Sequence, residues 1–258
     1  GGAPLFFRLF LRRAGRPGAV PQPDGPASRR ELAMHPFPDR SAAGVQLAEA
    51  VRTLFDSRDD RDRPVVLALP RGGVPVAYEV ARALGAPLDL VLVRKIGVPF
   101  QPELAAAAIV DGDAPQMVVN EDVLHGTRMT EADLEAGKAR ALAEIERRRA
   151  LYFGARAPIP VEGRDAVIVD DGIATGATAR VAMKALRSRG PRSLTLAVPV
   201  AAPDTLDRMG READHVVALR RPAAFGGVGQ HYLDFHQLDD AEVTGLLDAA
   251  RAFAPDTA

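Results

Sequence analysis

The sequence contains no cysteine among its 258 residues. This absence excludes disulfide bonds, thiolate metal sites and a cysteine nucleophile, and it fits a reducing compartment. No apolar run approaches the roughly 20 residues that a membrane-spanning helix needs. The longest runs, near residues 104–110 and 194–203, have the length of core strands. We therefore expect a cytoplasmic protein without a membrane partner.

The chain also lacks a surplus of positive charge, because its formal net charge is -1 at pH 7. The first 33 residues carry six arginines against two acidic residues, so the remainder is mildly acidic. Nucleic-acid-binding proteins usually carry a basic surface, and we therefore expect no nucleic-acid partner. With 47% hydrophobic and 26% charged residues, the composition is that of a globular protein with a sizeable core.

Residues 1–33 differ from the rest because proline, glycine and arginine interrupt any apolar periodicity. The apolar stretch at residues 5–11 is too short for the core of a signal peptide, and no small-residue cleavage site follows it. We interpret residues 1–33 as a disordered leader or upstream extension, with Met34 as the natural start. Residues 34–258 are predicted to form one domain.

Regular apolar patterns begin at Ser41, which is predicted to cap the first helix. Short apolar runs that indicate buried strands cover 65–69, 88–93, 166–169, 194–200 and 215–219. Helical spacing covers 42–55, 74–84, 179–189, 203–209 and 239–253. This alternation predicts an α/β fold with a parallel central sheet flanked by helices. Residues 104–119 are predicted to form a strand pair, and 131–151 a long charged helix.

A pair of acidic residues and a turn rich in glycine and threonine follow the strand at 166–169. The segment consists of Asp170, Asp171, Gly172, Ile173, Ala174, Thr175, Gly176, Ala177 and Thr178. Glycines let backbone N–H groups face an anion, and the following helix N-terminus favours negative charge. The turn thus suits a terminal phosphate, whereas the two carboxylates suit vicinal hydroxyls or a hydrated cation. Ala177 stands where a Walker A loop requires lysine, so the segment is not a P-loop.

This segment resembles the phosphoribosyl pyrophosphate signature of type I phosphoribosyltransferases. The resemblance implies that fold, with a small C-terminal hood at about residues 220–238. It also implies that Asp170 and Asp171 hold the ribose 2′- and 3′-hydroxyls and that residues 175–178 hold the 5-phosphate. A helical insertion at about 120–160 is absent from the minimal family fold, and we expect it to cover the site or to mediate homo-oligomerisation.

Two further segments are similar to parts of this family. The loop Pro70-Arg71-Gly72-Gly73 resembles the pyrophosphate loop, which in relatives often holds a non-proline cis peptide. Arg94 and Lys95 resemble the Arg-Lys pair of adenine and orotate phosphoribosyltransferases, which contacts the diphosphate. Each segment alone also fits a plain turn or a solvated basic pair.

The resemblance implies a nucleotide-salvage enzyme that transfers ribose 5-phosphate from phosphoribosyl pyrophosphate to a nitrogenous base and releases pyrophosphate. Arg71, Arg94 and Lys95 would neutralise the leaving diphosphate. Mg²⁺ is the expected cofactor, held mostly by substrate oxygens and water, with Asp170 and Asp171 in an outer-sphere role.

The nature of the base is the least determined part of this prediction. Enzymes of 6-oxopurines place an aspartate where this chain has Ala174, so hypoxanthine and guanine are not expected as substrates. Glu103 is the nearest carboxylate after the Arg-Lys pair and is a candidate proton-handling residue, or else a strand or helix cap. In the hood, Phe225 or Tyr232 is a candidate for stacking on the base, or else for packing.

Two other functions share the acidic signature. One is a non-catalytic regulator that binds phosphoribosyl pyrophosphate on the same fold. The other is half of a phosphoribosyl pyrophosphate synthetase, which the presence of a single signature copy disfavours.

Overall fold

The body of the molecule is a five-stranded parallel sheet with strand order β2-β1-β6-β7-β8. The computed structural model describes residues 35–55, 63–99, 101–112, 115–127 and 129–253, so the expectation for residues 1–33 lies outside it. The strands are β1 (Val65–Ala68), β2 (Leu88–Leu90), β6 (Asp165–Val169), β7 (Ser193–Val200) and β8 (His215–Arg220). Every residue of β1 and β6 is buried, because helices cover both faces of the sheet. The predicted parallel sheet flanked by helices is confirmed.

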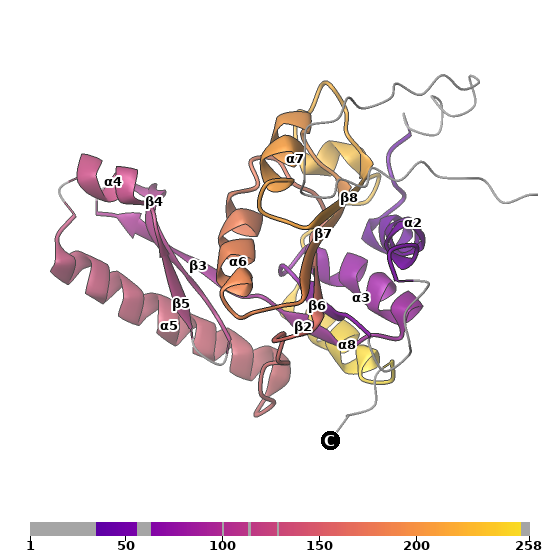
Figure 1. Ribbon diagram of the computed structural model, residues 1–258, viewed down its shortest axis with the longest axis horizontal. Helices are drawn as coiled ribbons and strands as arrows, with labels where there is room; N and C mark the ends of the chain where they lie inside the picture. Colours follow the sequence, from indigo (N-terminus) through magenta and orange to yellow (C-terminus); the bar gives the residue numbers. More distant parts are fainter. Residues whose placement is uncertain (1–34, 56–62, 100, 113–114, 128, 254–258) are drawn as a thin grey trace, which may run out of the picture.

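Two groups of helices cover the two faces of this sheet (Figure 1). One face carries α2 (Arg40–Arg52), α3 (Gly73–Leu84) and α8 (Asp240–Ala250), and the other carries α6 (Ala177–Arg187) and α7 (Pro203–Met209). The predicted N-cap of the first helix was wrong by two residues. Asp39 caps α2 by accepting a hydrogen bond from the backbone N–H of Ala42, whereas the Ser41 hydroxyl donates to Glu79.

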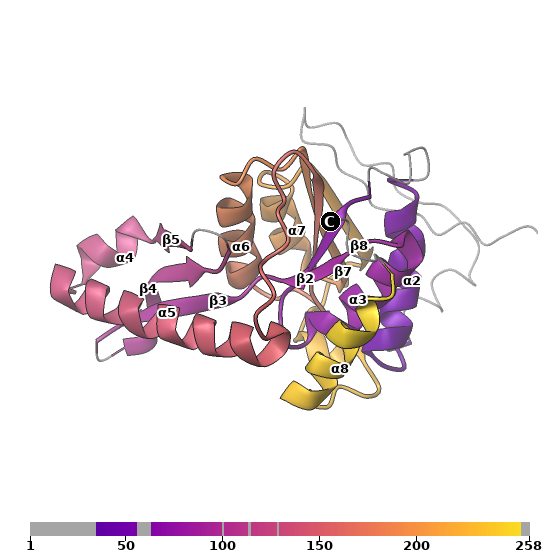
Figure 2. The same ribbon diagram turned by 90° about the horizontal axis from the view of Figure 1, so that it is seen from below.

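An arm formed by residues 93–153 projects from the body (Figures 1 and 2). It contains an antiparallel sheet of β3 (Val93–Val98), β4 (Gln101–Val110) and β5 (Gln116–Val119), then α4 (Glu121–Gly126) and α5 (Glu131–Phe153). The expected strand at 88–93 is therefore split between the two sheets, and the expected insertion at 120–160 is the second half of this arm. No helix in the described parts of the chain is long and apolar enough to cross a membrane.

The hood follows β8 and packs against the residues that precede α2. The backbone N–H of Phe37 donates to the carbonyl of His231, and the N–H of Leu233 donates to the carbonyl of Phe37. A short 3-10 helix, η2 (Val228–His231), lies within the hood. Two segments from opposite ends of the chain therefore meet beside the loop that follows β6.

Candidate functional site

The site lies where the connections of the parallel sheet change direction. β1 and β6 are neighbours in the sheet. The chain continues from β1 outward to β2, and from β6 outward in the other direction to β7 and β8. In open α/β sheets, ligands bind at the carboxyl ends of strands at such a switch point. Loop 70–73 follows β1 and loop 170–178 follows β6, so both predicted phosphate loops meet at this point.

Glycines allow these two loops to touch. A Cβ atom added to Gly72 would lie 2.0 Å from Oδ2 of Asp171, and one added to Gly73 would lie 2.7 Å from the carbonyl oxygen of Val169. A larger side chain at either position would therefore push the loops apart. The peptide bond between Pro70 and Arg71 is cis, as the family resemblance implies.

The acidic pair, Asp170 and Asp171, is partly shielded from solvent at the end of β6. Asp171 is buried, Asp170 is half-buried, and the backbone N–H of Asp171 donates to Oδ1 of Asp170 at 2.9 Å. Burial raises the pKa of Asp170, and the neighbouring Asp171 carboxylate raises it further. Burial also raises the pKa of Asp171, although the Arg40 guanidinium opposes this rise. A ligand with hydroxyl donors, or a cation, would replace the interactions with water that these carboxylates lose on burial.

Arg40 is a site residue that the sequence analysis missed. It begins α2, is only 8% exposed, and its Nε donates to Oδ2 of Asp171 at 2.8 Å. Its Nη1 donates to the carbonyl of His236, and its guanidinium carbon lies 3.9 Å from the centre of the Phe235 ring. No local pattern distinguishes Arg40 from a solvated helix residue. Only the packing of α2 against the carboxyl edge of the sheet brings it to Asp171.

The turn after the acidic pair has the geometry of an anion cup. Gly176 adopts φ +74° and caps α6, a conformation that favours glycine. The first N–H groups of α6 have no partners within the helix and face outward from its N-terminus. The hydroxyl of Thr205 donates to the carbonyl of Ala174 and braces the turn, while Thr175 stays exposed. Backbone donors and hydroxyls thus gather at one end of loop 170–178.

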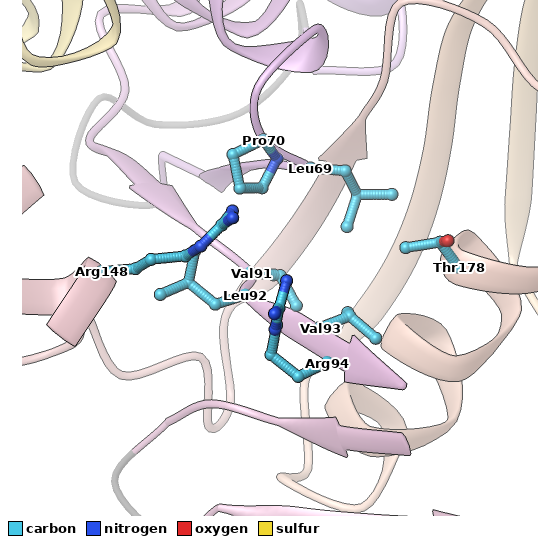
Figure 3. Close-up of a pocket in the computed structure, with 8 residues that line it drawn as sticks. All are labelled: Leu69, Pro70, Val91, Leu92, Val93, Arg94, Arg148 and Thr178. Carbon is cyan, nitrogen blue, oxygen red and sulfur yellow. The ribbon is translucent and has the colours of Figure 1, made fainter. Parts of the chain in front are cut away.

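A small cleft lies beside these loops, between the body and the base of the arm (Figure 3). It is lined by Leu69, Pro70, Val91, Leu92, Val93, Arg94, Arg148 and Thr178. Arg94 therefore lies where the sequence placed it, beside loop 70–73. Lys95, the next residue of β3, is exposed and does not line the cleft. The contact of the Arg94 and Lys95 pair with the diphosphate, which the resemblance implies, stays a prediction.

Two other residues were predicted for the site, Arg71 and Glu103, and they lie in different parts of the structure. Arg71 is partly exposed, and its Nη1 lies 4.0 Å from Oδ1 of Asp240 at the start of α8. Glu103 belongs to β4, six residues before Ile109, which pairs with Arg94. At roughly 3.3 Å per residue, the backbone of Glu103 therefore lies about 20 Å from that of Ile109 along the strand. The side chain of Glu103 lies outside the described residues, so its role as a proton-handling residue stays a prediction.

The aromatic side chains of the hood mainly pack within the protein. Tyr232 is 6% exposed, donates its hydroxyl to the carbonyl of Asp171 and packs between Phe37 and Phe235. Its buried ring therefore does not fit the expected role in stacking on a base. Phe225 is half-buried and stacks on His231 with ring centres 5.4 Å apart.

His236 lies at the exposed end of the same segment, between two carboxylates. Its Nε2 is 2.9 Å from Glu242 and its Nδ1 is 3.0 Å from Asp234, and hydrogen bonds to these two acids raise the pKa of His236.

Comparison with known proteins identifies relatives for most of the chain. A family model described as the phosphoribosyl transferase domain matches residues 41–218. A Mycobacterium tuberculosis protein, provisionally named a phosphoribosyl transferase, is 49% identical over 219 residues, which are 84% of this chain and 48% of that protein. The chain thus spans about half the length of the curated relative it matches.

A uracil phosphoribosyltransferase of Lactobacillus gasseri is 32% identical over 134 residues, covering 52% of this chain and 62% of that enzyme. Among solved structures, a protein from Thermus thermophilus superposes with a TM-score of 0.70 at 42% identity. That match covers 82% of this chain and 97% of the Thermus chain.

Proposed function

Because this chain belongs to the phosphoribosyl transferase domain family, we propose that it transfers ribose 5-phosphate from phosphoribosyl pyrophosphate to a nitrogenous base and releases pyrophosphate. The contact between Gly72 and Asp171 carries this proposal. It brings a loop suited to a diphosphate beside a carboxylate suited to ribose hydroxyls. Phosphoribosyl pyrophosphate has both groups on adjacent carbons of one sugar.

Each part of the site matches one part of this substrate. Asp170 and Asp171 would accept hydrogen bonds from the 2′- and 3′-hydroxyls, and the turn at 175–178 would hold the 5-phosphate through backbone donors. Arg71 and Arg94 would neutralise charge that develops on the leaving diphosphate. The bond between C1 and the diphosphate breaks as the nitrogen of the base bonds to C1. The protein contributes mainly positioning and electrostatic stabilisation.

Magnesium fits the donors of this site. Mg²⁺ prefers oxygen ligands and retains several waters, so one or two carboxylates together with substrate phosphates suffice to hold it. Asp170 and Asp171 supply such oxygens, and a nearby cation would oppose the rise that burial causes in their pKa values. When bound, the ion would balance charge on the diphosphate. We therefore place Mg²⁺ with the substrate, with these carboxylates in an outer-sphere role.

The acceptor base is proposed to be a pyrimidine or an adenine-like ring. Ala174 is exposed at the turn and carries no proton-handling group, and the buried Tyr232 donates its hydroxyl to the carbonyl of Asp171. The relative from Lactobacillus gasseri is named for uracil. Hypoxanthine and guanine would lack acid–base assistance, which is typically worth about a hundredfold or more in rate.

The function is tested by incubating the protein with phosphoribosyl pyrophosphate, Mg²⁺ and each of uracil, adenine, orotate, hypoxanthine and guanine while measuring released pyrophosphate. We expect release with a pyrimidine or adenine and little with the two 6-oxopurines. Efficient turnover of hypoxanthine or guanine alone would contradict the argument from Ala174. Tight binding of phosphoribosyl pyrophosphate without turnover of any base would favour the non-catalytic regulator.

A further inference from the structure

The last turns of α5 face the body through residues spaced four apart. Glu144, Arg148 and Tyr152 follow this spacing and lie on one side of the helix. Arg148 lines the cleft beside Pro70 (Figure 3). The buried Tyr152 donates its hydroxyl to Oδ1 of Asp240 at 2.6 Å, the same oxygen that lies 4.0 Å from Arg71. The arm therefore lies beside loop 70–73 through Arg148 and is linked to it through Asp240 by Tyr152.

This end of α5 gives the cleft an excess of positive charge. The Glu144 carboxylate accepts hydrogen bonds from Arg147 and Arg148, and these hold its pKa at about 2. Nη2 of Arg94 lies 3.8 Å from Oε1 of the same carboxylate. The single negative charge of Glu144 is thus surrounded by three arginines. Two of them, Arg94 and Arg148, line the cleft. Within the described residues, Arg148 is hydrogen-bonded through Nε, which leaves its two Nη groups available to an anion.

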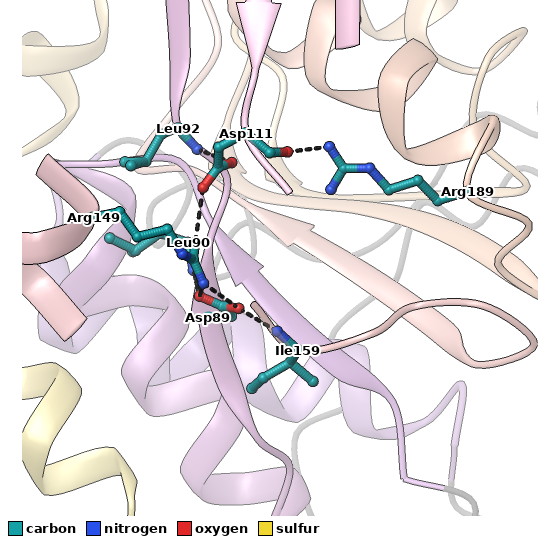
Figure 4. A network of polar contacts seen from close by, with 7 residues as sticks. All are labelled: Asp89, Leu90, Leu92, Asp111, Arg149, Ile159 and Arg189. Atoms are coloured by element: carbon teal, nitrogen blue, oxygen red, sulfur yellow. Dashed lines mark hydrogen bonds and ion pairs between the residues drawn. The ribbon is translucent and has the colours of Figure 1, made fainter. Parts of the chain in front are cut away.

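A buried ionic network fixes the helix in this position (Figure 4). Arg149 donates from Nη1 to Asp111 at 2.8 Å and from Nη2 to both carboxylate oxygens of Asp89 at 3.1 Å. Asp89 is part of β2 in the body, and it also accepts from the N–H of Ile159. Because Arg149 follows Arg148 directly, this anchor also holds the backbone from which the Arg148 side chain extends.

We propose that Arg148 is a diphosphate-binding residue, contacting the leaving group beside loop 70–73. The inference rests on the proposed function, which places the diphosphate at that loop. Arginine forms charge-assisted and often bidentate hydrogen bonds to phosphate oxygens. Arg148 comes from α5, within the helical insertion expected at about 120–160, so in this chain that insertion supplies part of the diphosphate subsite.

The test compares Arg148→Ala with Arg147→Ala in calorimetric titrations of the full chain with pyrophosphate and with ribose 5-phosphate, both with Mg²⁺. Arg147 is the matched control, because it bonds the same Glu144 but does not line the cleft. We expect Arg148→Ala to weaken pyrophosphate binding roughly 10- to 100-fold, the usual loss for a hydrogen bond to a charged group. Ribose 5-phosphate binding should change less than about twofold, and Arg147→Ala should change neither.

Pyrophosphate affinity in Arg148→Ala equal to that of the wild type would overturn the inference, as would an equal loss in Arg147→Ala. A wild-type chain that binds both ligands, with Arg148→Ala unchanged, would reject this inference alone. A wild-type chain that binds neither ligand would reject the proposed function as well. Arg148→Gln keeps most of the side-chain stem and gives the same comparison if the alanine variant does not fold.

Discussion

Asp171 is the residue on which most contacts of the site converge. Its carboxylate pairs with Arg40, its carbonyl accepts from Tyr232, and the missing side chain of Gly72 makes room for it. Both ion-pair partners are buried, with side chains 9% and 13% exposed. Removing one partner of a buried ion pair is strongly destabilising because it leaves an uncompensated charge. Stability and ligand binding are therefore linked at this residue.

Replacing Arg40 with methionine should lower the free energy of unfolding by about 3 kcal/mol, because Asp171 would remain buried without its partner. The double variant Arg40→Met/Asp171→Asn should recover much of this loss, since it removes both charges. Urea denaturation of the two variants and the wild type measures the effect. A single variant as stable as the wild type would show that the pair contributes nothing to the fold.

Gly72→Ala should destabilise the protein by roughly 1–3 kcal/mol, as overpacking does, and should weaken substrate binding. The new Cβ would lie 2.0 Å from a carboxylate oxygen that Arg40 holds in place. Gly245→Ala is the control, because it lies within α8 and a Cβ there meets nothing within 4 Å. The control should stabilise the protein by roughly 0.5–1 kcal/mol, as expected for glycine to alanine in a helix. Equal effects of the two variants would refute the contact between the loops.

Among the elements, the arm depends on a few buried charges where it joins the body. Asp111 follows β4, is 3% exposed, and accepts hydrogen bonds from the N–H of Leu92 and from Arg149 (Figure 4). Burial raises the pKa of Asp111 to about 6, although Arg149 opposes the rise. The folded protein therefore favours the protonated form of this carboxyl more than the unfolded chain does.

This shift predicts a dependence of stability on pH. A carboxyl whose pKa is raised in the fold contributes stability that is fully present below about pH 3.8 and is lost as the pH rises through about 6. The change is on the order of 3 kcal/mol. We expect the difference in unfolding free energy between the wild type and Asp111→Asn to fall across this window and then level off. A difference that stays flat, or that rises with pH, would contradict this assignment.

The elements that could be predicted from sequence are those whose structure depends on local sequence and not on distant tertiary contacts. Helix α7 was found because Pro203 marks its start, and the strand pair of the arm was found because apolar runs flank turn residues. The split between β2 and β3 was missed, since the apolar run at 88–93 does not show that its two ends join different sheets. Arg40 was missed because its role depends on contact across 131 residues.

For the whole molecule, the sheet topology decides where the site can be. Strand order reverses between β1 and β6, so the two loops that carry phosphate-binding signals are neighbours although 100 residues separate them in sequence. The arm then closes one side of this region with Arg94 and Arg148. The parallel sheet and the position of both loops were predictable from motifs, whereas the arm's contribution depended on its packing against the body.

The measurement that tests the central claim most directly is the thermal stability of the protein with phosphoribosyl pyrophosphate and Mg²⁺. A ligand present at 100 times its dissociation constant stabilises the native state by about 2.7 kcal/mol. The wild type and the surface control Asp248→Asn should therefore melt at a clearly higher temperature with ligand, whereas Asp170→Asn/Asp171→Asn should shift little. No shift in the wild type at millimolar ligand, or an equal shift in the double variant, would contradict a phosphoribosyl pyrophosphate site at the acidic pair.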